Sequence, residues 1–174
     1  MPITVTAVNI DYEFFWKDCC LLRLKNFKKE DHGNSYKQAF IERHIENILE
    51  RFKEGNLAEL KRELSAARYD VFSLTITQLH HLGECRLVLT LLDMGIVFKY
   101  LQNLAYLTLT YGAKHVGIKY ERSLFGMKMS DAKIFSDCLR TTQSLVYLSL
   151  PCNLIDDDLI SILIKGLMLN KTIS

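Results

Sequence analysis

The sequence has almost no excess charge of either sign. Its 22 Lys and Arg residues nearly balance 20 Asp and Glu residues, for a net charge of +2. Because this balance creates no broad field to attract nucleic acid or an anionic membrane, we predict neither as a partner. No uninterrupted apolar run reaches the roughly 18–20 residues that a membrane-spanning helix needs. The first residues also lack the basic segment and continuous apolar core of a secretory signal, so we expect a cytoplasmic or cytoskeletal protein.

Signatures of catalysis and of metal binding are also missing. The five cysteines are odd in number and form no Cys-x-x-Cys pair, which favours reduced thiols in an intracellular protein. In the pair Cys19 and Cys20, only one side chain can point inward on a helix. His80, His81 and Cys85 lack a fourth ligand at zinc-finger spacing, and no phosphate-binding glycine motif is present. We therefore predict no enzyme, no cofactor and no metal site.

The first 69 residues are predicted to be helical. Ser35 and Gln38 have the spacing of a capping box, and Gly55-Asn56 would end the helix that follows. The apolar face of this helix is formed by Tyr36, Phe40, Ile41, His44, Ile45, Ile48, Leu49 and Phe52. We expect His44 to be packed in the core. The polar face, with Glu42, Arg43, Glu46, Glu50, Arg51 and Lys53, is typical of a solvated helix surface. A second helix is predicted at about residues 57–68.

From Tyr69 onward the pattern changes to a repeat. The leucine-rich template L-x-x-L-x-L-x-x-N-x-L is matched at Val71/Leu74/Ile76/Leu79, at Leu104/Leu107/Leu109 and at Leu145/Leu148/Leu150. Apolar helical segments lie at about residues 85–101, 130–140 and 157–169. Since one such unit cannot bury its own apolar face, strands should form a parallel sheet with helices packed behind it. The predicted fold is α/β, a leucine-rich-repeat solenoid of ribonuclease-inhibitor-like strand–helix units over residues 70–174, preceded by a helical cap or docking region over residues 1–69.

The last predicted unit contains polar residues that capping explains. Asp156, Asp157 and Asp158 could suggest a cation site, but three acids at a helix start are typical of an N-cap and of the helix dipole. Ile173 begins the template again, 28 residues after Leu145. We expect about three repeat units with an open or truncated C-terminal end.

The spacing between the second and third units is longer than a regular repeat by about a dozen residues. The excess lies in "YGAKHVGIKYERSLFGMKM", where Lys114, Lys119, Arg122 and Lys128 face a single acid, Glu121. This segment is predicted to be a basic surface loop with Tyr120 at its centre.

Two groups of motifs resemble the dynein regulatory complex subunit 5 family, also called T-complex-associated testis-expressed protein 1. The first group is Phe15, Trp16, Cys19 and Cys20, then His32, Gly33, Ser35, Tyr36 and Lys37, then Glu42, Arg43, Ile45 and Glu46. The second is Leu109, Thr110, Tyr111 and Gly112, then Gly117, Tyr120 and Glu121, then Leu124, Phe125, Gly126 and Met127. Their order matches the family over most of residues 14–139.

This resemblance implies a non-catalytic scaffold subunit of the nexin-dynein regulatory complex in the axoneme of a cilium or flagellum. It implies other subunits of that complex as partners, and an acidic neighbour of the basic loop, either a further subunit or tubulin of the doublet microtubules. From the repeats, the variable strand positions should form a protein-binding face. The candidate partner-binding residues are Trp16, Thr75, Thr77, Tyr106, Thr108, Thr110, Lys114, Lys119, Tyr120, Arg122, Lys128, Tyr147 and Ser149.

A second hypothesis fits the same repeat pattern. A cytosolic leucine-rich-repeat protein could regulate an enzyme, as a GTPase-activating or inhibitor-like module. An arginine finger would require an arginine on an exposed strand–helix loop, and Arg122 is the candidate.

Overall fold

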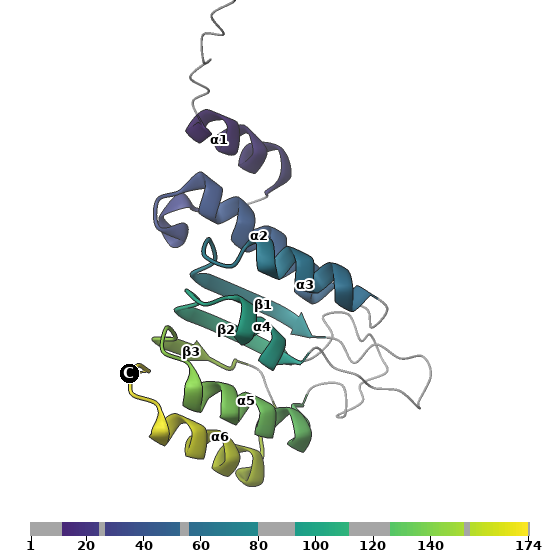
Figure 1. Cartoon of the computed structure of the whole chain (residues 1–174), viewed down its shortest axis with the longest axis vertical. Helices are drawn as coiled ribbons and strands as arrows, with labels where there is room; N and C mark the ends of the chain where they lie inside the picture. Colours follow the sequence, from purple (N-terminus) through teal and green to yellow (C-terminus); the bar gives the residue numbers. More distant parts are fainter. Residues whose placement is uncertain are drawn as a thin grey trace, which may run out of the picture.

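The computed structural model describes residues 12–24, 27–52, 56–79, 93–111, 126–151 and 154–173. The elements are helix α1 (Tyr12–Arg23), the 3-10 helix η1 (Lys29–His32), α2 (Tyr36–Glu50), α3 (Leu57–Ala66), β1 (Ser73–Leu79), α4 (Met94–Tyr100), β2 (Tyr106–Tyr111), α5 (Met129–Thr141), β3 (Tyr147–Ser149) and α6 (Asp157–Leu169). Figure 1 shows that they follow the long axis nearly in chain order, from α1 at the top to α6 at the bottom. Elements in close contact are therefore one or two places apart in the order of the chain.

The three strands form one parallel sheet in the order β1-β2-β3. Its register places Ser73 beside Tyr106 and Tyr106 beside Tyr147. The aliphatic residues two positions earlier in each unit, Val71, Leu104 and Leu145, are all 0% exposed and belong to one core. The segments that lead into the three strands therefore contribute equivalent side chains to a shared interior.

The core lies on one face of the sheet. Leu74 and Ile76 of β1 are buried, as are Leu107 and Leu109 of β2, whereas the residues between them are partly or fully exposed. This alternation places one set of side chains against the helices and leaves the other set on the open face. Residues of five helices belong to the same core: Ile45 and Leu49 of α2, Leu60 and Leu64 of α3, Met94 and Val97 of α4, Ala132, Phe135 and Leu139 of α5, and Leu159 and Leu163 of α6.

The observed helices agree closely with the sequence pattern. The bounds of α3, α5 and α6 lie within two residues of those predicted. Helix α4 corrects the predicted segment 85–101, because it begins only at Met94, after the extended N-cap residue Asp93. Helix α2 begins after the expected N-cap, where the Ser35 hydroxyl accepts a bond from the Gln38 N–H, but it ends at Glu50, earlier than expected. The leucine-rich-repeat solenoid and the division at residue 69 stay predictions.

Helices α5 and α6 approach each other closely at one point. The Ser136 hydroxyl of α5 donates a hydrogen bond of 2.7 Å to the carbonyl oxygen of Ile162. A Cβ atom added to Gly166 of α6 would overlap the carbonyl oxygen of Ser136. The absence of a side chain at Gly166 therefore permits the helices to pack at this distance.

We expect Gly166→Ala to lower the free energy of unfolding by about 1–3 kcal/mol, because the added methyl group would force the two helices apart. In a helix without this contact, the same substitution would raise the free energy of unfolding by up to about 1 kcal/mol. A decrease in the free energy of unfolding would therefore identify the close contact. Urea unfolding measures the difference. The neighbouring exposed site provides the control Lys165→Ala, which should change stability by less than about 0.5 kcal/mol. A Gly166→Ala protein as stable as the control would contradict this packing.

Candidate docking surface

The open face of the sheet carries hydroxyl and aromatic side chains in rows across the strands. The in-register rows are Ser73, Tyr106 and Tyr147, then Thr75, Thr108 and Ser149. The tyrosine rings of Tyr106 and Tyr147 lie 6.3 Å apart between centroids and are 52% and 50% exposed. Thr77 and Thr110 continue the same face along β1 and β2. The structure thus brings together the candidate strand residues that the sequence analysis placed on one face.

Three glutamates of α2 bind the outer edge of β1. Each accepts backbone N–H groups through its Oε1 atom, and we call this set the glutamate row. The bonds join Glu42 to Phe72 and Ser73 (2.8 Å each), Glu46 to Thr75 (2.6 Å) and Glu50 to Thr77 (2.7 Å). Glu50 also accepts the Thr77 hydroxyl at 2.5 Å, so this hydroxyl already has a partner within the chain. The row fixes the position of β1 and thereby of its exposed side chains.

The expectation of a solvated helix face was wrong for Glu42 and Glu46, whereas Glu50 is half-buried. Glu42 is 0% exposed and Glu46 is 5% exposed. Their hydrogen bonds to the strand compensate for the loss of water around the carboxylates. Four-residue spacing among the three glutamates was the sequence signal that could have indicated a common acceptor face.

His32 connects η1 to the glutamate row. Its Nδ1 atom lies 2.5 Å from Oε2 of Glu42, and both side chains are buried. The Gln38 side-chain amide donates to Oε1 of Glu42 at 3.0 Å. One carboxylate therefore joins η1, α2 and the start of β1, a role that the sequence analysis did not assign to His32.

A groove of about 580 Å³ lies between η1 and the open face of the sheet. Its lining residues are Glu30, Asp31, Gly33, Gln38, Phe72, Ser73, Tyr106, Thr108 and Tyr147. We call it the acidic groove, because its described lining contains two carboxylates and no Lys, Arg or His side chain. The repeat pattern predicted the two tyrosines as partner-binding residues, but no pattern in the sequence indicated the two acids, which come from a distant part of the chain.

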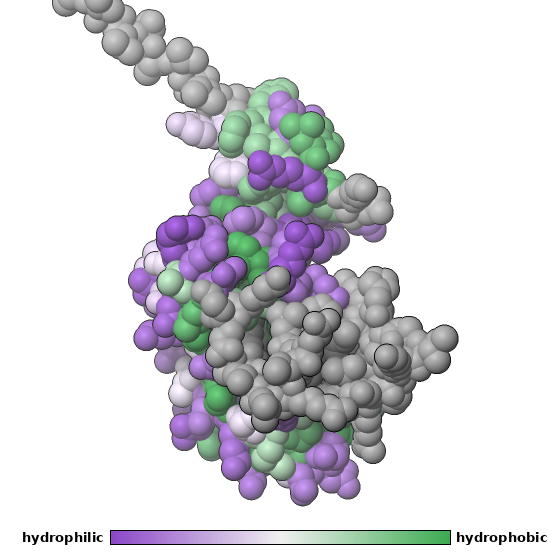
Figure 2. All heavy atoms as spheres, turned by 90° about the vertical axis from the view of Figure 1, so that its right-hand side faces the viewer, coloured by the Kyte–Doolittle hydropathy of each residue, from purple (hydrophilic) through white to green (hydrophobic). Residues whose placement is uncertain are grey.

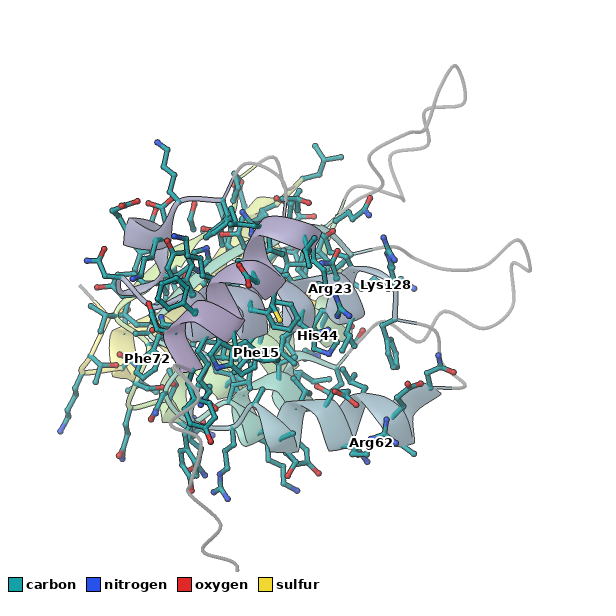
Figure 3. The ribbon with its side chains drawn as sticks, turned by 90° about the horizontal axis from the view of Figure 1, so that it is seen from above. Phe15, Arg23, His44, Arg62, Phe72 and Lys128 are labelled. Atoms are coloured by element: carbon teal, nitrogen blue, oxygen red, sulfur yellow. The ribbon has the colours of Figure 1, made fainter. Side chains whose placement is uncertain are left out.

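The remaining candidates do not belong to the acidic groove. Lys128 precedes α5 as its N-cap residue, and Figure 3 shows Phe72 and Lys128 on opposite sides of the molecule. Trp16 is half-buried on α1, with its ring 5.5 Å from that of Phe40 between centroids. The other members of the predicted basic loop, Lys114, Lys119, Tyr120 and Arg122, lie outside the described residues.

Helix α1 also has an exposed apolar side. Figure 2 shows hydrophobic side chains gathered over this end of the molecule, beside charged ones. The large exposed residues there are Tyr12, Phe14, Phe15, Leu21 and Leu22. Trp16 and Cys20 lie on the more buried side of the same helix, which agrees with the expectation that one cysteine of the pair points inward.

His44 is exposed, which corrects its predicted place in the core. Its side chain is 48% exposed and its ring stacks beside that of Phe40, at 6.5 Å between centroids. Nε2 lies 3.4 Å from a carboxylate oxygen of Glu63 on α3. The helical spacing placed His44 near the apolar face, but the histidine lies at the border of that face.

Two of the described thiols, those of Cys20 and Cys138, have raised pKa values. Burial raises the pKa of Cys20, and the nearby Cys19 and Glu13 raise it further. Burial, with Asp93 and Asp137 close by, raises the pKa of Cys138 to about 11. Both side chains therefore remain protonated near neutral pH and are poor nucleophiles.

Other candidate chemistry has structural explanations. The Asp156 carboxylate caps α6 by accepting the Leu159 N–H at 2.9 Å, as the sequence predicts. Across the described ranges, His, Cys, Asp and Glu form no group of three or more that could hold a metal ion. None of the helices in those ranges has the length and apolarity required to cross a bilayer.

These observations define an α/β protein whose parallel strands and helices alternate, with a polar and aromatic sheet face beside an acidic groove. No family model matches the chain. Curated proteins named dynein regulatory complex subunit 5 do match it. The identity is 35% over 91% of the chain for the protein of Chlamydomonas reinhardtii, 28% over 97% for that of Mus musculus and 26% over 97% for that of Homo sapiens. The chain is therefore homologous to the dynein regulatory complex subunit 5 family, as its motifs indicated. It spans 38–39% of the length of these relatives.

We expect Glu46→Ala to lower the free energy of unfolding by about 1–3 kcal/mol, because the Thr75 N–H would lose its acceptor. Glu46→Gln retains a carbonyl oxygen at that position and should cost less. The glutamine variant loses the ion pair with Arg43 (2.9 Å), which is partly exposed and contributes at most about 1 kcal/mol. Equal urea midpoints for the two variants would show that the Glu46–Thr75 bond contributes nothing measurable.

The same site should make stability depend on pH. Burial raises the pKa of Glu46 above its ordinary value of 4.5, despite the opposing effects of the Thr75 N–H and Arg43. Because the folded state holds this proton more tightly than the unfolded state, the contribution of Glu46 to stability is largest below pH 4.5 and falls as pH rises through the raised pKa. Stability of wild type relative to Glu46→Gln should therefore decrease between about pH 4 and pH 7. A difference that grows in favour of wild type over this range would contradict the direction of the shift.

Proposed function

We propose that this chain is part of a non-catalytic scaffold in the nexin-dynein regulatory complex. In this role it binds neighbouring subunits in the axoneme and supports the regulation of dynein motility in cilia or flagella. Its homology to proteins named dynein regulatory complex subunit 5 supports the assignment to that complex. The chain spans 39% of the length of the Chlamydomonas relative. We therefore propose, for this chain, the role that a whole subunit would have.

The observation that carries the scaffold role is the open face of the sheet. Hydroxyl and aromatic side chains occupy its in-register rows, while the opposite face is filled by the core. A face of this kind offers hydrogen bonds and flat contacts without strong charge, which suits protein binding. Tyr106 and Tyr147 are its large exposed side chains and are placed to act as anchors.

The proposal includes a leucine-rich-repeat arrangement of the strand–helix units. Equivalent burial of Val71, Leu104 and Leu145 supports it, as does the parallel order of the strands. In such an array each unit buries its apolar face against the next, and the strands together present one extended surface. The basic sequence around Lys119 and Arg122 would offer a second contact, to an acidic region of another subunit or of tubulin.

We expect Tyr106→Ala combined with Tyr147→Ala to weaken co-sedimentation with axonemes that lack this subunit but retain the other subunits of the regulatory complex. Loss of two aromatic anchors should reduce the apparent affinity by roughly tenfold or more. Both rings are half-exposed, so circular dichroism and urea unfolding should show a retained fold. Tyr69→Ala removes a similarly exposed tyrosine (59%) outside the acidic groove and is the matched control. Wild-type binding by the double variant would refute docking through this face.

A further inference from the structure

We propose that the acidic groove binds an extended, arginine- or lysine-bearing segment of a neighbouring protein. The inference rests on the proposed docking function and specifies the chemistry of one partner. It concerns the surface between η1 and the first row of the sheet, where carboxylates, aromatic rings and an open hollow occur together.

Charge is the first argument for a basic occupant. Glu30 and Asp31 are exposed at the rim, and neither forms an ion pair with another described residue. The neighbouring Lys29 interacts electrostatically with Glu30 but forms its ion pair with Glu13, because its ammonium lies 2.8 Å from a Glu13 oxygen and 4.3 Å from the centre of the Tyr36 ring. The two carboxylates are therefore available to a cation from outside the described chain.

The aromatic floor is the second argument. Phe72, Tyr106 and Tyr147 line the same hollow and are 40%, 52% and 50% exposed. A guanidinium group stacks on aromatic faces, and the aliphatic stem of arginine or lysine packs on apolar surface. A basic side chain could place its stem against these rings while its charged end meets Glu30 or Asp31.

The rim has a defined position relative to the sheet. Gly33 and Asn34 adopt left-handed conformations (φ 60° and 58°) that turn the chain directly after η1. The bond between His32 and Glu42 then ties η1 to the start of β1. Since the acids and the rings are held by one network, little ordering should be needed when a partner binds.

The same arrangement disfavours an acidic partner. A glutamate-rich segment would place like charges beside Glu30 and Asp31 with no described basic side chain in the lining to offset them. Any contact with the acidic tail of tubulin therefore belongs to another part of the protein. The groove discriminates between partners by sign of charge.

The test uses the full 174-residue chain and fluorescently labelled synthetic peptides, one with spaced arginines and one with glutamates at the same positions. We expect the arginine peptide to bind and the glutamate peptide not to bind, as measured by anisotropy. Glu30→Gln with Asp31→Asn keeps the side-chain shapes and should weaken binding about tenfold at low salt. Raising the salt from about 50 mM to about 300 mM should weaken wild-type binding and bring it close to that of the variant.

The matched control is Asp18→Asn with Glu59→Gln, which removes two exposed carboxylates outside the acidic groove. It has the same net charge as the groove variant, so a difference between the two variants isolates the effect of position from that of total charge. Equal affinities for the two double variants, or equal binding of the two peptides by wild type, would overturn the inference. Unfolding curves of both variants verify that each is folded.

Co-sedimentation with axonemes that lack this subunit but retain the other subunits of the complex separates this inference from the proposed function. If wild type co-sediments but the peptides show no charge preference, the groove inference fails and the scaffold role survives. If the arginine peptide binds as expected but wild type does not co-sediment, the groove inference is supported and the axonemal role fails.

Discussion

The outer edge of β1 is the constraint on which the rest of the sheet depends, because its backbone N–H groups must bind an acceptor away from water. Helix α2 supplies that acceptor through the glutamate row. Four residues of a helix span about 6.0 Å along its axis, and two residues of a strand span about 6.6 Å. Because these lengths are nearly equal, glutamates spaced four residues apart on α2 can reach every second backbone N–H group of β1. An uncovered edge would invite pairing with another chain. The row closes this edge with charge-assisted hydrogen bonds and fixes the strand that begins the docking face.

Glu42 extends the influence of this row beyond the sheet. It bonds to Phe72 and Ser73 through one oxygen and to His32 through the other. The His-Gly-x-Ser motif and the Glu-Arg motif, ten residues apart between His32 and Glu42, thus meet in one buried network. This contact gives a physical reason why both motifs occur in the same chain. It also explains how a short 3-10 helix can hold two acids beside strand residues that are distant in sequence.

The sequence predicted those features that depend on local periodicity. Alternation around Leu74, Ile76, Leu107 and Leu109 identified the buried face of the strands, and helical spacing located α3, α5 and α6. The sequence-based prediction was wrong for Glu42 and Glu46, because charged residues on a helix are normally solvated. The backbone N–H groups that these two carboxylates accept lie about 30 residues away in sequence. No local pattern contains that pairing. The acidic groove was missed for the same reason: Glu30 and Asp31 acquire their role only when η1 is tied to a sheet that forms later in the chain.

Polar side chains also satisfy backbone groups at the other end of the sheet. The Asn170 amide donates to the carbonyl oxygens of Leu139 and Thr142, which terminate α5, and its oxygen accepts the N–H groups of Thr172 and Ile173. Thr172 in turn donates to the carbonyl oxygen of Leu145 just before β3. These bonds direct Ile173 toward the core, against which its partly buried side chain packs. Thus a carboxylate row fixes the first strand and an amide fixes the chain after the last helix, while apolar packing fills the space between. The polar contacts determine where each strand–helix unit lies, and hydrophobic burial supplies most of the driving force that holds the units together.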